Sequence, residues 1–220
     1  ANREPMLAVM EQHASSVAKI GADVPVATNG ARANVFEAVI GAAADAWHEA
    51  LTFGAEHGYR NAQATLLAPT GTIAFMMDCD TTGVEPAIAL VSYKKLVGGG
   101  TLKQVNGTVH HGLSTLGYND HEAAYIVDAL HAGASIDTLI GNEYAPVFAT
   151  ALGENAISPE AHIRMVAAVQ PFLSGSVSKT ANVPADATVE DIERLYILAW
   201  QLGLKSVAIY RDGCKATQPV

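Results

Sequence analysis

The last two thirds of the sequence alternates short apolar runs with longer segments that carry helix signals, and this alternation most constrains the fold. Residues 62–68 and 87–97 are predicted to be strands, as is the β-branched run 204–210. Helices are expected between the last two strands, at 158–169 and 188–202. Strands that alternate with helices favour an α/β arrangement with mainly parallel pairing.

Capping residues set the expected bounds of these helices. Ser158 stands at the N-cap before Pro159, and Thr188 precedes acidic residues in a first turn. Shorter helices are expected at 111–116 and 121–131.

The first sixty residues are mainly helical in their pattern. Residues 5–20 and 34–57 have helical periodicity, and a glycine follows each run. Asn34 and Glu37 have the spacing of a capping box, and residues 22–30 are expected to form a loop. The apolar stripe predicted to be buried on the second helix consists of Val35, Val39, Ala42, Ala46, Ala50 and Phe53.

Composition excludes several classes of function. Half of the 220 residues are hydrophobic and 16% are charged, which is typical of a globular protein. The net charge is −9 without a block of Lys or Arg, so binding to long nucleic acid is not expected. No apolar run reaches the length of a membrane span. The two cysteines, Cys79 and Cys214, follow no zinc pattern, and a reducing, cytoplasmic location is expected.

A possible anion-binding turn follows the first predicted strand. It has the sequence Pro69-Thr70-Gly71-Thr72-Ile73-Ala74. If a helix begins there, free backbone N–H groups point outward, and the Thr70 and Thr72 hydroxyls add donors. The turn matches neither GxxxxGK[ST] nor GxGxxG. On local grounds an ordinary strand-to-helix turn with threonine caps is the more frequent alternative.

Other polar clusters are less specific. The acids around Cys79, in residues 78–86, suit either a metal ion or a structural loop in which Asp side chains bind backbone N–H groups. Residues 174–180 are rich in hydroxyls and contain one lysine, which suits either assistance with a phosphate or a polar turn that enters a strand, and the turn is favoured locally. His110 and His111 are adjacent and the other histidines stand singly, so no metal site is expected.

Taken together, four blocks of sequence resemble adenosylcobalamin-dependent (class II) ribonucleotide reductases. They are residues 64–86, 93–100, 168–175 with 179–184, and 204–213. The blocks occur in order, and the resemblance covers nearly the whole chain.

The resemblance implies a ten-stranded α/β barrel made of two half-barrels, with a radical cysteine on an inner finger loop. This chain is expected to form a half-barrel of parallel strands with helices outside, after a helical N-terminal segment. Residues 1–220 are then one fragment of the barrel domain, with 1–60 mainly helical and 61–220 carrying the phosphate-binding loop. The substrate is a ribonucleoside di- or triphosphate, and adenosylcobalamin generates the thiyl radical. Substrate phosphates are expected at Thr70, Gly71, Thr72, Ile73 and Ala74, with Pro69 near the nucleoside.

Departures from the family pattern predict that the isolated chain is inactive. The family's radical cysteine lies in Asn-x-Cys-x-Glu, but Met77 stands two residues before Cys79 and Asp212 two before Cys214. The chemistry needs three cysteines, so no catalytic residue is expected here. The chain would need the missing N-terminal part of the reductase or a split-enzyme partner, and its exposed sheet edges predict self-association. The alternative is a non-catalytic nucleotide- or protein-binding module on the same fold.

Overall fold

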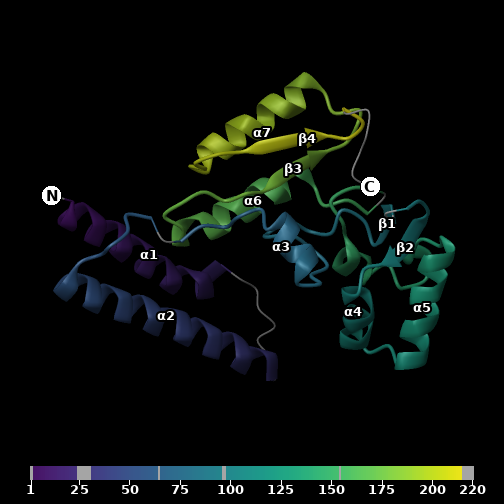
Figure 1. Cartoon of the computed structure of the whole chain (residues 1–220), viewed down its shortest axis with the longest axis horizontal. Helices are drawn as coiled ribbons and strands as arrows, with labels where there is room; N and C mark the ends of the chain where they lie inside the picture. The colour runs from purple at the N-terminus through teal and green to yellow at the C-terminus, as the bar shows by residue number, and fades with distance from the viewer. Residues whose placement is uncertain (1, 24–30, 64, 96–97, 154, 215–220) are drawn as a thin grey trace. The chain divides into compact units, whose positions relative to one another are not determined.

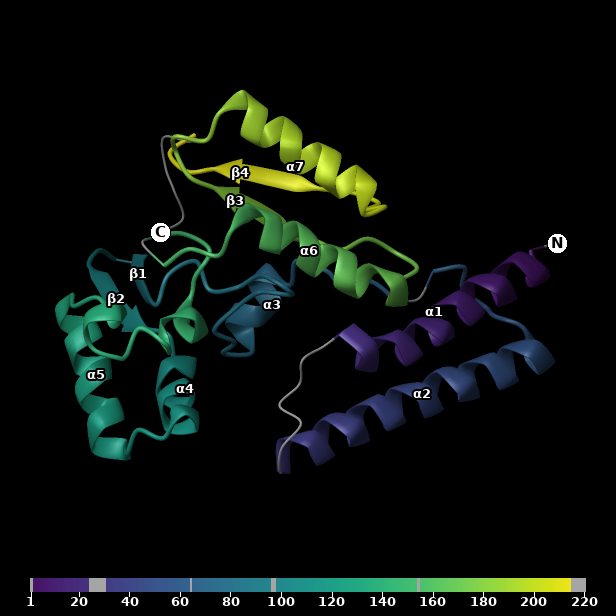
Figure 2. The same cartoon turned by 180° about the vertical axis from the view of Figure 1, so that it is seen from behind.

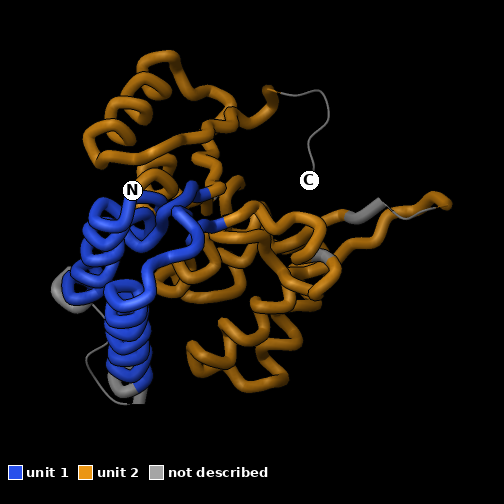
Figure 3. The backbone as a smooth tube through the Cα atoms, turned by 60° about the vertical axis from the view of Figure 1, so that its left-hand side comes forward, with its two compact units in different colours: residues 1–67, 166–177 blue, residues 68–165, 178–220 orange. Residues whose placement is uncertain are grey.

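The computed structural model describes residues 2–23, 31–63, 65–95, 98–153 and 155–214. Contacts divide the chain into two units, shown in different colours in Figure 3. Unit 1 comprises residues 1–67 and 166–177, and unit 2 comprises residues 68–165 and 178–220. Every helix in the described residues is too short or too polar to cross a membrane.

Unit 1 is built on an antiparallel pair of long helices, α1 (Arg3–Asp23) and α2 (Ala31–His57), as Figure 1 shows. Both helices were predicted from periodicity. The predicted bounds were less accurate, because α1 continues past Gly21 and α2 begins three residues before Asn34. The proposed capping box at Asn34 is therefore wrong. Most of the predicted loop, residues 24–30 with Pro25 and Gly30, lies outside the described residues.

The buried face of α2 is displaced by one residue from the predicted stripe. Val35, Val39 and Phe53 are 64%, 60% and 54% exposed. The more buried positions one residue along the helix are Phe36, Ile40, Ala43, Trp47, Leu51 and Gly54, and of the predicted stripe Ala50 is also partly buried. Two adjacent faces of α2 are apolar, so periodicity alone does not choose between them.

Close contacts around Gly54 explain which face is buried. A Cβ atom at Gly54 would lie 2.0 Å from Cζ of Tyr59, so Tyr59 packs directly on the bare helix backbone. The Tyr59 hydroxyl donates to the Ala50 carbonyl at 2.8 Å. On the same side, the His13 ring of α1 lies 5.3 Å from the Trp47 ring. Because of these contacts, the face of α2 that carries Trp47 and Gly54 is the more buried one.

The predicted strand at 62–68 is wrong. The structure has an isolated parallel bridge between Leu67 and Val177. Leu67 N–H donates to the Ser176 carbonyl at 3.1 Å, and Gly175 N–H donates to the Thr65 carbonyl at 2.8 Å. Apolar composition alone does not make a strand, because a strand also needs a continuous hydrogen-bonded ladder.

Unit 2 contains β1, β2, β3 and β4 and most of the shorter helices. The predicted helices at 111–116, 121–131, 158–169 and 188–202 are all confirmed. Residues 159–165 of α6 belong to this unit, and the rest of α6 and η3 (Gln170–Phe172) belong to unit 1. The elements in chain order are α3 (Gly71–Met76), β1 (Val91–Lys95), β2 (Thr101–Val105), α4 (Thr108–Leu116), α5 (Asp120–Ala132), η1 (Ile136–Thr138), η2 (Ala145–Phe148), α6 (Pro159–Val169), β3 (Thr180–Val183), α7 (Val189–Gln201) and β4 (Ala208–Arg211).

The strands form two small sheets. β1 and β2 pair antiparallel, with Val91 opposite Val105, so the predicted strand at 87–97 is shorter than expected and β2 was missed. Residues 96–97 lie outside the described chain. β3 and β4 pair in parallel, with Thr180 opposite Ala208. The described residues have mixed helix and strand content compatible with an α/β fold. They form no half-barrel of parallel strands and no closed barrel, because each strand pairs with one neighbour.

Two hydrophobic clusters stabilise unit 2. One joins α4, α5 and the turns η1 and η2 around Leu113, which is fully buried. The other joins Ile163 of α6 and Leu195 of α7 to β3. Figure 1 and Figure 2 show α7 beside the β3–β4 pair, and Arg194 of α7 pairs with Glu160 of α6 at 3.6 Å. The second cluster therefore fixes β3, whose N-terminal end contributes to the site described next.

Candidate functional site

The predicted anion loop lies at the start of α3. Pro69 and Thr70 precede the helix, which begins at Gly71. Thr70 has a φ of 51°, in the left-handed region that β-branched residues rarely adopt. The helix is only six residues long, and Ala74 N–H donates to the Thr70 carbonyl at 2.9 Å. The amide of Ala74 is therefore already used.

Three amides of the first turn remain available. Among the described residues, no hydrogen bond is made by the N–H groups of Gly71, Thr72 or Ile73. The side chains of Thr72 and Ile73 are exposed. The first N–H groups of a helix need partners from outside it, so this turn offers three adjacent donors.

The loop that contains Gly83 contacts the predicted anion loop at Thr70. Gly83 N–H donates to Oγ1 of Thr70 at 2.6 Å. A Cβ atom at Gly83 would lie 2.6 Å from the Ala68 carbonyl oxygen, and Gly83 has a φ of 54°. Only glycine meets both requirements without strain. Gly83 therefore allows the two loops to touch through their backbones.

The acidic loop at 78–86 is held by its own side chains. Oδ1 of Asp80 accepts from Gly107 N–H, just before α4, at 2.8 Å. This contact fits the structural interpretation of the acidic loop. Cys79 is a free, exposed thiol. The described residues contain no group of three or more His, Cys, Asp and Glu side chains that could hold a metal ion.

A buried ionic network lies at the C-terminal end of this loop, and the sequence did not reveal it. Lys179 is 6% exposed. Its Nζ lies 2.7 Å from Oε2 of Glu85, 2.7 Å from Nδ1 of His162 and 2.7 Å from the Thr180 carbonyl oxygen. The other Glu85 oxygen, Oε1, accepts from Thr180 N–H at 2.6 Å. All three ammonium protons and both carboxylate oxygens are therefore used.

His162 is held neutral in this network. It is 2% exposed, and burial, followed by the positive charge of Lys179, lowers its pKa from 6.5 to about 4, although Glu85 opposes the shift. Nδ1 accepts from the Lys179 ammonium, so the ring proton lies on Nε2. Within the part of the chain that the structure describes, Nε2 is buried without a partner.

Two members of this network lie in segments that the sequence singled out: Glu85 in the acidic run 78–86, and Lys179 as the single lysine in residues 174–180. Neither segment was predicted to contact the other. Glu85 and His162 are distant in sequence, 94 and 17 residues away from Lys179, so no local pattern joins them.

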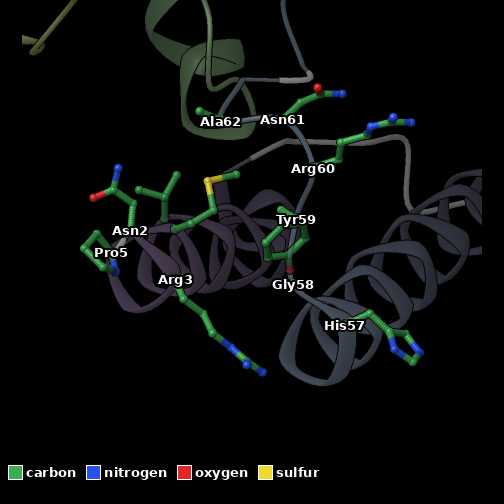
Figure 4. A pocket seen from close by; sticks show the side chains of 11 residues that line it. Asn2, Arg3, Pro5, His57, Gly58, Tyr59, Arg60, Asn61 and Ala62 are labelled. Carbon is green, nitrogen blue, oxygen red and sulfur yellow. The ribbon is translucent and has the colours of Figure 1, made fainter.

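A cavity of about 570 Å³ lies in unit 1, whereas the predicted loop belongs to unit 2. It is lined by the start of α1 and by residues 57–62 (Figure 4). Arg3 and Arg60 line it, but Figure 4 shows their side chains extending away from each other. Arg3 donates to the Ala55 carbonyl. The cavity therefore lacks a convergent set of polar groups, which a ligand site requires.

Comparison with known proteins gives consistent matches along the chain. The family described as ribonucleotide reductase, barrel domain, matches residues 6–210. A vitamin B12-dependent ribonucleotide reductase of Streptantibioticus cattleyicolor is 53% identical over 181 residues, covering 81% of this chain and 30% of the relative. Proteins of the same name from Rhodopirellula baltica and Streptomyces coelicolor are 49% and 46% identical and cover 100% of this chain. The chain spans 21% and 22% of those two relatives.

Proposed function

Because the chain belongs to the ribonucleotide reductase barrel-domain family, we propose that it is part of an enzyme that converts ribonucleotides to 2′-deoxyribonucleotides. The names of the relatives and their match to the whole chain support this proposal. The proposal extends to the architecture: residues 1–220 belong to one ten-stranded barrel domain of a cytoplasmic enzyme, and other parts of the protein supply the remaining strands.

The proposed cofactor is adenosylcobalamin, since the relatives are named vitamin B12-dependent. When bound, it would supply the radical for the reaction. No cobalamin contact is assigned to residues of this chain. Cys79 and Cys214 are both exposed and free, and two cysteines are too few for one radical and two redox roles. We therefore propose that this chain alone is inactive and acts with its N-terminal part or a split-enzyme partner.

The contribution proposed for this chain is to hold the phosphates of a ribonucleoside di- or triphosphate. Support comes from the unused N–H groups of Gly71, Thr72 and Ile73 at the start of α3. Adjacent amides and hydroxyls hold phosphate oxygens without needing net positive charge, which suits a chain with a net charge of −9. Ala74 would contribute by closing the turn, and Pro69 would face the nucleoside.

Gly71→Val tests the phosphate loop. An added Cβ would meet no atom within 4 Å, so the fold tolerates it, while the branched side chain crowds the space in front of the amides. Hydrogen bonds to a charged group contribute roughly 1.5–3 kcal/mol each. In an intact reductase carrying this segment, we expect nucleotide Kd to rise about tenfold or more. Equilibrium binding without turnover measures this effect.

Two controls isolate the phosphate contribution. Gly41→Val adds the same atoms to α2, where a Cβ also meets nothing within 4 Å, and it should leave Kd unchanged. A nucleoside without phosphates should bind the Gly71→Val enzyme as it binds the unaltered one. An unchanged nucleotide Kd in Gly71→Val would remove the phosphate role.

We also propose that the isolated chain self-associates. Trp200 and Val189 on α7 are each 78% exposed, and in unit 1 Val35 and Val39 are exposed on α2. Within the described residues, the two-stranded sheets have unpaired edges as well. Light scattering should give a mass at least twice the 22.9 kDa of one chain. Trp200→Lys should lower the mass and Glu193→Gln should not, whereas a monodisperse monomer would rule the proposal out.

A further inference from the structure

A continuous series of contacts joins the phosphate loop to the buried ionic network. Thr70 binds Gly83 through its hydroxyl, and Gly83 stands two residues before Glu85. Glu85 binds Lys179 and Thr180 on β3. All of these residues belong to unit 2. We infer that Glu85 and Lys179 are positioning residues, which hold Thr70 and the following amides in the geometry that receives phosphate. This inference rests on the proposed phosphate role of the loop.

The phosphate loop needs such a support because Thr70 is strained. Its left-handed backbone is unfavourable for a β-branched residue. The hydrogen bond from Gly83 N–H to the Thr70 hydroxyl compensates for that strain only while Gly83 stays in place. A Cβ atom at Gly83 would lie 2.6 Å from the Ala68 carbonyl oxygen, so the two segments are in close contact at this point. A displacement of Gly83 would therefore release Thr70 and redirect the three amides after it.

Glu85 connects the segment that contains Gly83 to β3. A turn from Glu85 N–H to the Thr82 carbonyl, 3.0 Å long, makes residues 82–85 one compact piece. The carboxylate then fixes that piece to β3 through two separate donors, the Lys179 ammonium and Thr180 N–H. Ala181 and Val183 of β3 are buried in one cluster with Ile163 of α6 and Leu195 of α7, so the strand that holds the Glu85 carboxylate is well packed.

The burial of Lys179 also points to a positioning role. A buried ion pair contributes little net stability compared with apolar residues of similar volume, because both charges lose their hydration. Its main effect is to impose one geometry, since each proton and lone pair requires its own partner. Here that geometry fixes the end of the loop that touches Thr70.

Glu85→Gln in an intact reductase tests the inference. A glutamine has one acceptor oxygen where β3 presents two donors, so it cannot satisfy both Lys179 and Thr180. We expect the nucleotide Kd to rise about tenfold while the Kd of the phosphate-free nucleoside stays unchanged. Hydrogen exchange at the Gly83 amide should become faster. A merely structural role would change both affinities together or neither.

Controls separate this inference from the proposed function. Arg194→Gln breaks the exposed ion pair with Asp191 on α7, 3.0 Å long, and should change neither affinity. If Gly71→Val weakens nucleotide binding and Glu85→Gln does not, the positioning role is wrong and the phosphate role stands. If neither variant weakens it, the phosphate role itself has failed.

A double variant keeps the test decisive if Glu85→Gln does not fold. Glu85→Leu with Lys179→Met removes both buried charges and every polar link from the loop to Lys179. We expect it to fold and to bind nucleotide as weakly as Gly71→Val. Normal nucleotide affinity in this double variant overturns the inference.

Discussion

We expect Lys179→Met to lower the free energy of unfolding by about 3–5 kcal/mol, because it leaves the Glu85 carboxylate in a mostly buried site without its counter-charge. Lys179 is 6% exposed and lies 2.7 Å from the carboxylate, so solvent screens this pair weakly. His162 also loses the proton donor to its Nδ1. Urea unfolding of the 220-residue chain, followed by circular dichroism, measures the loss.

Two further variants check that the loss comes from the orphaned charge. Glu85→Gln with Lys179→Met keeps an acceptor for Thr180 N–H and leaves no buried charge, so it should recover much of the lost stability. Lys103→Met removes a lysine that is bound at the surface to the His131 carbonyl, and should cost less than about 1 kcal/mol. A loss of similar size in Lys179→Met and Lys103→Met would contradict the explanation.

We expect acid to destabilise this protein through His162. The folded-state pKa is about 4, below the ordinary value of 6.5. Between these two values the unfolded chain binds a proton at His162 that the folded chain does not, so stability falls as pH falls from 6.5 to 4. The contribution is fully present above pH 6.5. About 3 kcal/mol is lost by pH 4, since one pKa unit corresponds to about 1.4 kcal/mol.

The measurement is the free energy of unfolding of the intact chain at several pH values from 7.5 to 4. Other groups titrate in this range, so the informative quantity is the difference between the unaltered chain and His162→Gln. That variant should have a flatter profile. His121→Gln, at an exposed position of α5, should keep the original slope. Parallel profiles for the unaltered chain and His162→Gln would show that His162 does not carry the effect.

The helices could be predicted because their signals are local. Asn119 with Glu122 and Thr188 with Asp191 form complete capping boxes, each within four consecutive residues. Apolar periodicity likewise spans one helix at a time. The strands were harder to predict, because a strand exists only where a neighbour completes its ladder. The run at 62–68 has strand composition, but Leu67 makes a single bridge.

The choice between two apolar faces of α2 also depended on contacts outside the helix. Val35 and Phe36 are both apolar and adjacent, and helical spacing allows either to be buried. The buried face is selected by residues outside α2: Tyr59 packs on Gly54, and His13 lies beside Trp47.

By itself, the sequence determined the family resemblance, the long helices and the position of the turn proposed to bind phosphate, because each depends on consecutive residues. Tertiary structure alone decided how that turn is supported. Glu85, His162 and Lys179 share no sequence pattern, and their burial becomes favourable only where folding brings opposite charges and hydrogen-bond partners within 2.7 Å. The strained Thr70 and the backbone contact at Gly83 have the same origin, because a loop adopts such geometry only when another segment holds it.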